Sequence, residues 1–257
     1  MGSAFIHPTA VVSEKAEIDS SVVIGPLAIV EDNVHIGAGS TIGPLSIIRN
    51  FSRIGKNNTI DAHVVIGGDP QHTAFDGSES WVRIGDNNII REATVIHRAF
   101  VPVAATIVGS DCFLMSQLHI GHDCVIGDKI TLSSYVVLGG HVEIGDCAVL
   151  GGGTGVHQFL RIGAYSMVAG QTPLRKDVLP YSMIGGNPVR HYRLNSVGLR
   201  RAGIKKERYR ALEASFRALR EGDKEMSGVP DTEEVNQLRE WLSVKSNRGV
   251  YGFLCKD

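Results

Sequence analysis

The stretch HIGHDCVIGDKITLSSYVVL, residues 119–138, places an aliphatic side chain at every sixth position, at Ile120, Ile126, Leu132 and Leu138. The same spacing continues in three unbroken runs, over residues 6–66, 84–96 and 108–168. A glycine often follows the aliphatic residue, and a small or apolar residue often stands four positions after it. The chain is therefore built from internal repeats of six residues.

A period of six fits neither a helix, which repeats at about 3.6 residues, nor a half-buried strand, which repeats at about 2. One short strand followed by one turn accounts for it, with glycine relieving the turn of the restriction that a Cβ imposes. Three such sides close one coil, and stacked coils pair through their backbones at a spacing of about 4.8 Å. The sequence therefore predicts a mainly β protein, with a parallel β-helix over residues 1–190.

Two interruptions of the repeat predict loops that project from the coil. The segment GGDPQHTAFDGSES, residues 67–80, lacks the pattern and is rich in Gly, Asp and Ser. A shorter interruption, HRAFVPVAAT, covers residues 97–106. Both insertions are whole multiples of six, so a poorly matched coil would give the same count, but the composition favours loops. We expect them near residues 68–82 and 98–106.

Several histidines fall close to the coil phase at which both loops leave, once the loops are removed from the count. Random placement would scatter them over three edges of the prism, as it does His35 and His63. The clustered histidines are His97, His119, His122, His141 and His157. We interpret this row as functional, although stacked polar residues can also satisfy turn backbones.

His122 is the strongest candidate for a general base, because imidazole titrates near neutral pH. Asp123 follows it directly and can fix the imidazole tautomer by accepting a hydrogen bond. Gly140 lies one coil further at the same phase, and its amide can stabilise an oxyanion by roughly 3–4 kcal/mol. His97, His119 and His141 would then donate hydrogen bonds to substrate.

A rival hypothesis uses the same edge as a metal site. His119, His122 and His141 together offer three imidazoles, and three histidines with one open position suit catalytic zinc. A zinc enzyme resembling the hexapeptide-repeat carbonic anhydrases would use such a set. The residues alone do not decide between the two hypotheses.

Composition narrows the class of protein. The chain of 257 residues has a formal net charge of −1, which argues against a general nucleic-acid binder. No apolar run approaches the about 18 residues that span a bilayer, and the N-terminus lacks a signal-peptide pattern. The cysteines form no CxxC pair, which predicts free thiols in a reducing, cytoplasmic compartment. They are Cys112, Cys124, Cys147 and Cys255.

The repeat fades after Val168, and residues 191–257 are predicted to form a C-terminal helical domain. KKERYRALEASFRALREG, residues 205–222, has apolar residues at helical spacing and ends in glycine. DTEEVNQLREWLSV, residues 231–244, opens with a possible capping box, for which Asp231 with Glu234 is the better match. A cluster of Lys and Arg residues in and just before the first helix predicts a basic surface, which would suit an acidic protein or a phosphate-bearing ligand. Its residues are Arg200, Arg201, Lys205, Lys206, Arg208 and Arg210.

Taken together, the chain resembles the acyl carrier protein-dependent UDP-N-acetylglucosamine 3-O-acyltransferases, which begin lipid A biosynthesis. The stretches that carry the resemblance span nearly the whole chain in the family's order. They are IGPLAIV, GGDPQ, IGDNNIIREATVIHR, HIGHDCVIGD, GGHVEI, VHQFLRIGA, GNP and GLRRAG.

The resemblance implies a left-handed coil and a homotrimer with active sites between subunits. It implies that His122 activates the sugar 3-hydroxyl and that the Gly140 amide holds the oxyanion. The acyl donor is carried on the phosphopantetheine of acyl carrier protein, so no cofactor of the enzyme itself is expected, and no metal. The substrate-binding positions that it implies, or that lie in its motifs, are Gln71, His72, His97, His119, His141, His157, Gln158, Asn195 and Arg201, with Gly170 at the acyl-chain ruler position.

Some positions depart from the family pattern. His72 and Ala74 stand where the family usually has Asp and Lys in the first loop, and Val197 and Ala202 replace charged residues near the tail. A different nucleotide-sugar acceptor, including a 3-amino sugar, a paralogous pathway, and a noncatalytic binder of nucleotide sugar or carrier protein all stay open as alternatives.

Overall fold

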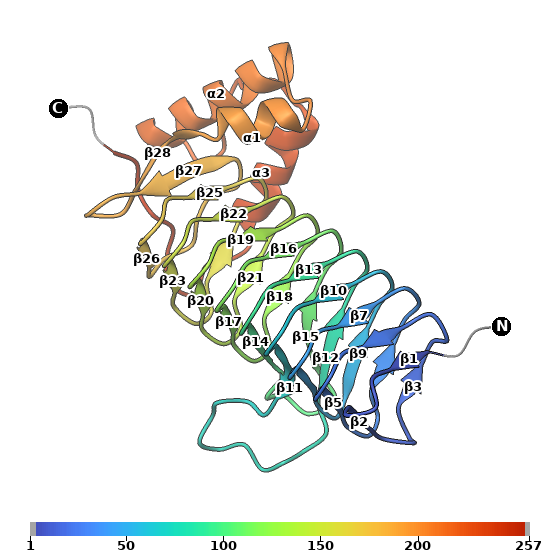
Figure 1. The fold of residues 1–257 in the computed structure, drawn as a ribbon. Helices are drawn as coiled ribbons and strands as arrows, with labels where there is room; N and C mark the ends of the chain where they lie inside the picture. Colours follow the sequence, from blue (N-terminus) through green and yellow to red (C-terminus); the bar gives the residue numbers. More distant parts are fainter. Residues whose placement is uncertain (1–3, 255–257) are drawn as a thin grey trace.

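A computed structural model describes residues 4–254; Cys255 lies outside this range. The described chain winds into a prism whose three faces are β-sheets, with helices packed at its C-terminal end (Figure 1). We call the sheets face A, face B and face C, in the order in which the chain enters them. No helix within residues 4–254 is long and apolar enough to cross a membrane.

Short strands build each face. Face A contains β1 (Phe5–Ile6), β4 (Val23–Ile24), β7 (Thr41–Ile42), β10 (Thr59–Ile60), β13 (Ile89–Ile90), β16 (Phe113–Leu114), β19 (Thr131–Leu132), β22 (Val149–Leu150), β25 (Met167–Val168), β27 (Ser182–Gly185) and β28 (Arg190–Leu194). Face B contains β2 (Val11–Val12), β5 (Ile29–Val30), β8 (Ile47–Ile48), β11 (Val65–Gly68), β14 (Val95–His97), β17 (His119–Ile120), β20 (Val137–Leu138), β23 (Gly155–Val156) and β26 (Pro173–Leu174). Face C contains β3 (Glu17–Ile18), β6 (His35–Ile36), β9 (Ser52–Ile54), β12 (Trp81–Ile84), β15 (Ala105–Val108), β18 (Val125–Ile126), β21 (Glu143–Ile144) and β24 (Arg161–Ile162).

Each strand pairs with the strand one coil later, so that equivalent positions stack. On face A, for example, Val23 lies beside Thr41, and Thr41 beside Thr59. The pairing is parallel along the coil, and only the final pair of face A, β27 with β28, is antiparallel among the described strands. The predicted mainly β, parallel β-helix architecture is therefore confirmed.

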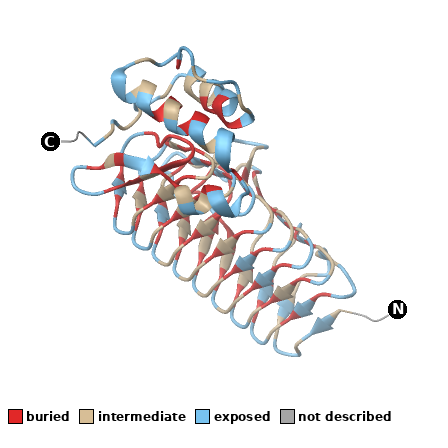
Figure 2. Cartoon of the chain, turned by 90° about the horizontal axis from the view of Figure 1, so that it is seen from above, coloured by how far each residue is buried: buried red, intermediate tan, exposed pale blue. Residues whose placement is uncertain are grey.

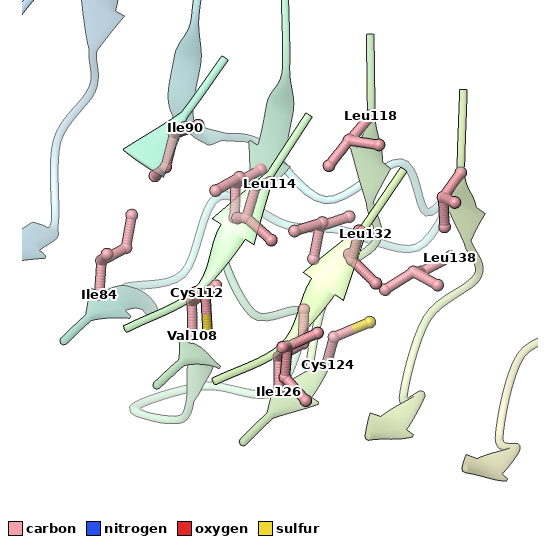
Figure 3. Close-up of a cluster of buried hydrophobic side chains, with 14 of the residues drawn as sticks. Ile84, Ile90, Val108, Cys112, Leu114, Leu118, Cys124, Ile126, Leu132 and Leu138 are labelled. Carbon is pink, nitrogen blue, oxygen red and sulfur yellow. The ribbon is translucent and has the colours of Figure 1, made fainter. Parts of the chain in front are cut away.

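The aliphatic residue of each repeat points into the prism and forms its core. Ile24, Leu114 and Leu132 are completely buried, whereas the preceding residue of each strand faces outward. Figure 3 shows Leu114, Leu132 and other buried side chains of the repeat between the strands of successive coils. From Ile24 onward the buried positions recur coil after coil along the prism (Figure 2). The six-residue hydrophobic period in the sequence therefore reflects aliphatic side chains that pack along the prism axis in one continuous core.

The glycine after each aliphatic residue has a different role from the one that the sequence predicted. Left-handed backbone occurs two residues later, at non-glycine positions such as Leu45 and His63. Gly43, by contrast, lies where an added Cβ would approach the backbone carbon of Asp61 to 2.6 Å. Glycine at this position therefore permits close approach of neighbouring coils. Gly67, where the first loop leaves, does have a positive φ of 85°, but turn freedom was the wrong reason for the other glycines that follow an aliphatic residue.

Both interruptions of the repeat are loops. Residues 69–80 connect β11 to β12 and project from the side of the prism, and residues 98–104 connect β14 to β15 (Figure 1). Each loop leaves from the end of a face B strand and returns at the start of a face C strand. They therefore lie at the same edge of the prism.

The C-terminal segment contains α1 (Ser196–Arg201), α2 (Lys206–Glu221) and α3 (Glu233–Ser243). The side chain of Thr232, not that of Asp231, accepts the capping hydrogen bond at the start of α3, so the predicted choice of cap was wrong. Arg208 pairs with Glu233 and the buried Glu234, which joins α2 to α3. It therefore does not belong to the free basic surface to which the sequence assigned it.

Substitution of Gly43 by alanine should destabilise the coil by about 1–3 kcal/mol, the usual range for overpacking, because its new Cβ meets backbone that cannot rotate away. Gly155→Ala is the matched control, since a Cβ there meets nothing within 4 Å. Urea unfolding of the two variants measures the difference. Equal stability of both would contradict a coil-spacing role for Gly43.

Candidate active site

The histidine row lies along the edge where the chain turns from face B to face C. His97 ends β14, and His119 begins β17. His122, His141 and His157 occupy the turns after β17, β20 and β23. The ring centroids of His97 and His119 lie 4.9 Å apart, and those of His122 and His141 lie 5.2 Å apart. We call this line of turns the B–C edge.

His122 and Asp123 form a hydrogen-bonded pair at the centre of the B–C edge. Nδ1 of His122 lies 2.7 Å from Oδ2 of Asp123, and the side chains are only 11% and 7% exposed. The Asp123 carboxylate also accepts from the Phe100 amide, so we assign the proton to Nδ1 of His122. This tautomer leaves a lone pair on Nε2 and makes that atom the proton acceptor of the pair.

The same carboxylate holds the second loop. Its Oδ2 accepts from the Phe100 N–H at 2.8 Å, and its Oδ1 accepts from the Val101 N–H at 3.2 Å. The Asp123 N–H in turn donates to Oγ1 of Thr106 at 2.8 Å, just beyond the loop. Asp123 therefore fixes both the imidazole and the loop beside it, and the roles of Phe100 and Thr106 were not foreseen from the sequence.

Gly140 lies against the face of the His122 imidazole. A Cβ on Gly140 would stand 2.6 Å from Cε1 of His122, so only glycine leaves room for this ring position. The Gly140 N–H has no acceptor among the described residues. Pro26 and Pro44 occupy the equivalent place in their turns, which shows that this turn does not need the amide. The amide is thus free for a ligand beside Nε2 of His122.

Arg98 anchors the first loop, although nothing in the sequence pattern singled it out except its position next to His97. Its guanidinium bonds to the Asp69 carboxylate at 3.0 Å and to the Ser78 carbonyl at 3.0 Å, close to the two ends of the loop. The ring of Phe75 lies 4.9 Å from the same group. A nearly buried cation therefore sets the conformation of residues 69–80.

The first loop carries His72 to the B–C edge. Its ring packs on Phe100 with centroids 4.1 Å apart and meets His122 at right angles at 5.8 Å. Nδ1 of His72 accepts from the Ala74 N–H, so in the neutral ring the proton lies on Nε2. The neighbouring Gln71 is exposed. The loop therefore presents an imidazole, and no carboxylate or lysine, from positions 72 and 74.

Burial keeps three imidazoles of the row neutral near pH 7. Desolvation lowers the pKa of His97, of His119 and of His141, and neighbouring imidazoles add to this effect. Nδ1 of His97 donates to the Asp69 carbonyl at 2.7 Å, and its buried Nε2 has no partner within residues 4–254. His141 stacks on Phe159 at 4.6 Å. These rings act as hydrogen-bonding groups and not as cations.

Other predicted site residues are placed differently. His157 and Gln158 lie on the B–C edge but are exposed. Gly170 lies in the turn from face A to face B, and Asn195 caps α1 beside the Tyr165 carbonyl. Arg201 is exposed at the end of α1. A single chain therefore does not bring these last three residues to His122.

The possible metal ligands also differ from the predicted set. Within residues 4–254, the group close enough to share a metal ion is His122, Asp123 and His141, whose ligand atoms lie within 4.8 Å of one another. His119 is not in this group. The predicted set of His119, His122 and His141 is therefore not assembled, because one of its three imidazoles faces His97 instead.

A coil of six-residue repeats with a histidine–carboxylate pair at its edge belongs to the hexapeptide-repeat transferases. Residues 33–68 match the model of bacterial transferase hexapeptide repeats. Residues 177–251 match the model described as UDP-N-acetylglucosamine O-acyltransferase, domain 2. The β-helix and the C-terminal segment therefore both match models of this class of transferase.

Relatives that align over most of the chain identify the family. Acyl-[acyl-carrier-protein]–UDP-N-acetylglucosamine O-acyltransferase of Burkholderia orbicola is 43% identical, over 91% of this chain and 88% of that protein. The Xanthomonas oryzae enzyme of that name is 41% identical over 97% and 93%. A Synechocystis relative of that name aligns over 62% of this chain and 58% of its own length, at 38% identity. The chain belongs to the UDP-N-acetylglucosamine O-acyltransferase family and is an acyltransferase.

Solved structures agree with this assignment. The UDP-N-acetylglucosamine O-acyltransferase of Moraxella catarrhalis has a TM-score of 0.90 and 38% identity, covering 96% of this chain and 99% of that one. The Bacteroides fragilis enzyme has a TM-score of 0.92 and 33% identity at the same coverage. A coil of opposite hand would not superpose at such values, so this chain shares their hand, which the resemblance predicts to be left.

Asp123→Asn should lower the rate of acyl transfer by about 10⁴-fold, the loss that the equivalent change causes in a serine-protease triad. The amide would donate to Nδ1 of His122 and move the ring proton to Nε2, and it would offer only one acceptor to the two loop amides. Steady-state rates measure the first effect, and hydrogen exchange at Phe100 measures the second. Asp128→Asn, a turn carboxylate on another edge that accepts from the Ser110 N–H, is the control and should leave both unchanged.

Proposed function

We propose that this enzyme transfers a 3-hydroxyacyl chain from acyl carrier protein to the 3-position of UDP-N-acetylglucosamine, the first step of lipid A biosynthesis, with His122 as general base. The names of the relatives supply the donor and acceptor. The observation that carries the mechanism is the His122–Asp123 pair facing the free amide of Gly140. Acyl transfer needs such a base and such an oxyanion donor side by side.

The proposed reaction uses each atom of this arrangement. Nε2 of His122 takes the proton of the sugar hydroxyl as its oxygen attacks the thioester carbonyl. The carbonyl oxygen becomes an oxyanion, and the Gly140 N–H donates to it. When the intermediate collapses, the carbon–sulfur bond breaks and the imidazolium returns its proton to the leaving thiolate. Asp123 stabilises the imidazolium in between, and no group beyond the carrier's phosphopantetheine is required.

The remaining imidazoles are proposed to bind substrate. His119 and His141 are half-buried, neutral and adjacent to the pair, so they can donate hydrogen bonds without repelling a cationic intermediate on His122. His72 and Gln71 of the first loop would contact the acceptor beside His122. His97 would hold the start of this loop through its hydrogen bond to the Asp69 carbonyl. His157 and Gln158 would line the same edge further along.

A homotrimer with shared sites is proposed because one chain leaves the site incomplete. Gly170, Asn195 and Arg201 lie away from the B–C edge, so a second copy has to supply them if they line the pocket. The outward ladder of face B is apolar over several coils, whereas that of face C carries charged residues such as Glu17 and Arg53. The face B ladder contains Val11, Ile29, Ile47, Val65 and Val95. Val11 and Ile29 are exposed in the single chain and the other three are half-buried, and an apolar strip of this kind is typical of an interface.

The free basic surface of the C-terminal segment is proposed to bind the carrier protein. Arg200, Lys205 and Arg210 are exposed on or between α1 and α2, and an acidic carrier would be attracted to them.

Cys112, Cys124 and Cys147 are free thiols, which suits a cytoplasmic enzyme that meets both substrates in a reducing compartment.

His122→Ala should lower acyl transfer by about 100- to 10,000-fold, because a positioned general base contributes that much. The wild type and the variant are assayed for thioester consumption with acyl carrier protein donors against a panel of UDP-sugars. We expect UDP-N-acetylglucosamine to be the preferred acceptor. Preference for a 3-amino sugar would replace the acceptor and keep the mechanism.

His63→Ala is the matched control, because His63 is an exposed histidine on another edge, and it should leave the rate unchanged. Full activity of His122→Ala, with a normal circular-dichroism spectrum, would remove the general-base mechanism. No turnover of any acceptor by the wild type would favour a noncatalytic binder.

Mixed oligomers test the shared site. His122→Ala and Asn195→Ala should each be nearly inactive alone, since one lacks the base and the other a pocket residue. Chains mixed after reversible denaturation should regain activity, because some sites then combine an intact His122 with an intact Asn195 from another copy. The regained rate is measured against each variant refolded alone. No gain from mixing would show that both residues act within one chain.

A further inference from the structure

The His122–Asp123 pair has a third partner that the proposed reaction does not need as a base. Nε2 of His141 lies 3.7 Å from Oδ2 of Asp123, the oxygen that also bonds Nδ1 of His122 at 2.7 Å. The ring planes of His122 and His141 are nearly perpendicular, at 88°, so the two imidazoles meet edge to face. Two imidazole nitrogens and a carboxylate oxygen therefore converge on one point.

We infer that His122, Asp123 and His141 form a binding site for a divalent transition-metal ion such as zinc, and that the bound ion inhibits acyl transfer. The inhibition part rests on the proposed function, whereas binding of the ion does not. The three ligand atoms already lie within 4.8 Å of one another. Ligands about 2.0–2.2 Å from a tetrahedral zinc ion lie roughly 3.3–3.5 Å apart, so small side-chain shifts complete the site.

The ligands are held in place by contacts outside the site. The Asp123 carboxylate is fixed by the amides of Phe100 and Val101, which can stay bonded while an oxygen lone pair binds the ion. His141 is fixed by its stacking on Phe159. Its side chain is 31% exposed, so an ion can enter from this side. The site is thus pre-formed and accessible.

The ligand set selects the kind of ion. Two imidazoles with one carboxylate and an open position suit zinc, cobalt, nickel and copper, whereas magnesium prefers a shell of oxygen ligands. The set differs from the three-histidine arrangement of zinc enzymes that hydrate carbon dioxide, because Asp123 takes the place of one imidazole.

Inhibition follows from the nitrogen that the ion would occupy. Nδ1 of His122 faces Asp123, so an ion between them replaces the proton on Nδ1. A neutral imidazole bound through Nδ1 carries its proton on Nε2, which then has no lone pair to accept the proton of the sugar hydroxyl. The ion would therefore switch the base off by exchanging one tautomer for the other, with His122 still in place.

The test uses the full chain after treatment with a chelator, and zinc or cobalt ions as probes. Equilibrium dialysis should find one zinc ion per chain, and cobalt should give the visible absorption of a four- or five-coordinate site. Acyl transfer should be lost at saturating zinc, restored by EDTA, and unaffected by magnesium. His141→Ala should lose the cobalt absorption, and His63→Ala should keep it.

The outcomes separate this inference from the proposed function. Absence of stoichiometric zinc binding, or binding that survives in His141→Ala, would overturn the metal site while leaving the general-base mechanism intact. Binding that is lost in His141→Ala but does not inhibit would keep the site, overturn the inhibitory role, and count against His122 as the base. A chelator-treated enzyme that is inactive until zinc is added would overturn both the inhibitory role and the proposed metal-free mechanism.

Discussion

Backbone pairing between successive coils is the constraint on which the rest of the structure depends. Because each strand aligns with the strand one coil later, every residue is assigned to a face or an edge by its phase alone. The same pairing brings coils so close that Gly43 has no space for a Cβ. It also stacks the turns of the B–C edge, so that histidines far apart in the sequence become neighbours. The spacing of the coils thereby sets the distances between functional side chains on the edges of the prism.

Asp123 concentrates the organisation of the site in one side chain. It orients His122 and accepts from both amides of the second loop, while its own amide is held by Thr106. A base positioned by a carboxylate that is itself anchored in backbone hydrogen bonds loses little entropy when the substrate binds. The second loop and His122 are therefore coupled through one carboxylate, and under the proposed function this coupling would hold the loop beside the base.

The sequence predicted those features that depend on phase and missed those that depend on contact. The period of six gave the coil, the core residues and the shared edge of His122 and His141, because all three follow from counting. It did not reveal that Arg98 anchors the first loop, since a loop conformation has no period. It misassigned the glycines, because residue identity alone does not separate a need for positive φ from a need for close approach. It also placed His119 in a metal set that the tilt of the ring toward His97 does not permit.

The charge of the site is set by the residues that lie against the imidazoles of the B–C edge. His72 and Ala74 stand where the resemblance leads one to expect an acidic and a basic residue, and the ring of His72 packs on Phe100. Within residues 4–254, Asp123 is the carboxylate that pairs with His122 and His141, and it already accepts three hydrogen bonds, which leaves it little capacity for a substrate. Under the proposed function, the groups of one chain that are left to contact the acceptor are imidazoles, side-chain amides and backbone amides, which bind by geometry more than by charge. The cation of Arg201 would come from a second copy. A pocket of this kind would discriminate by the position of donors and acceptors on the sugar, and Asp123, with its hydrogen bonds already made, would be a poor partner for an ammonium group. A hydroxyl, or an amine in its neutral form, is the nucleophile that this environment accommodates at the lowest desolvation cost.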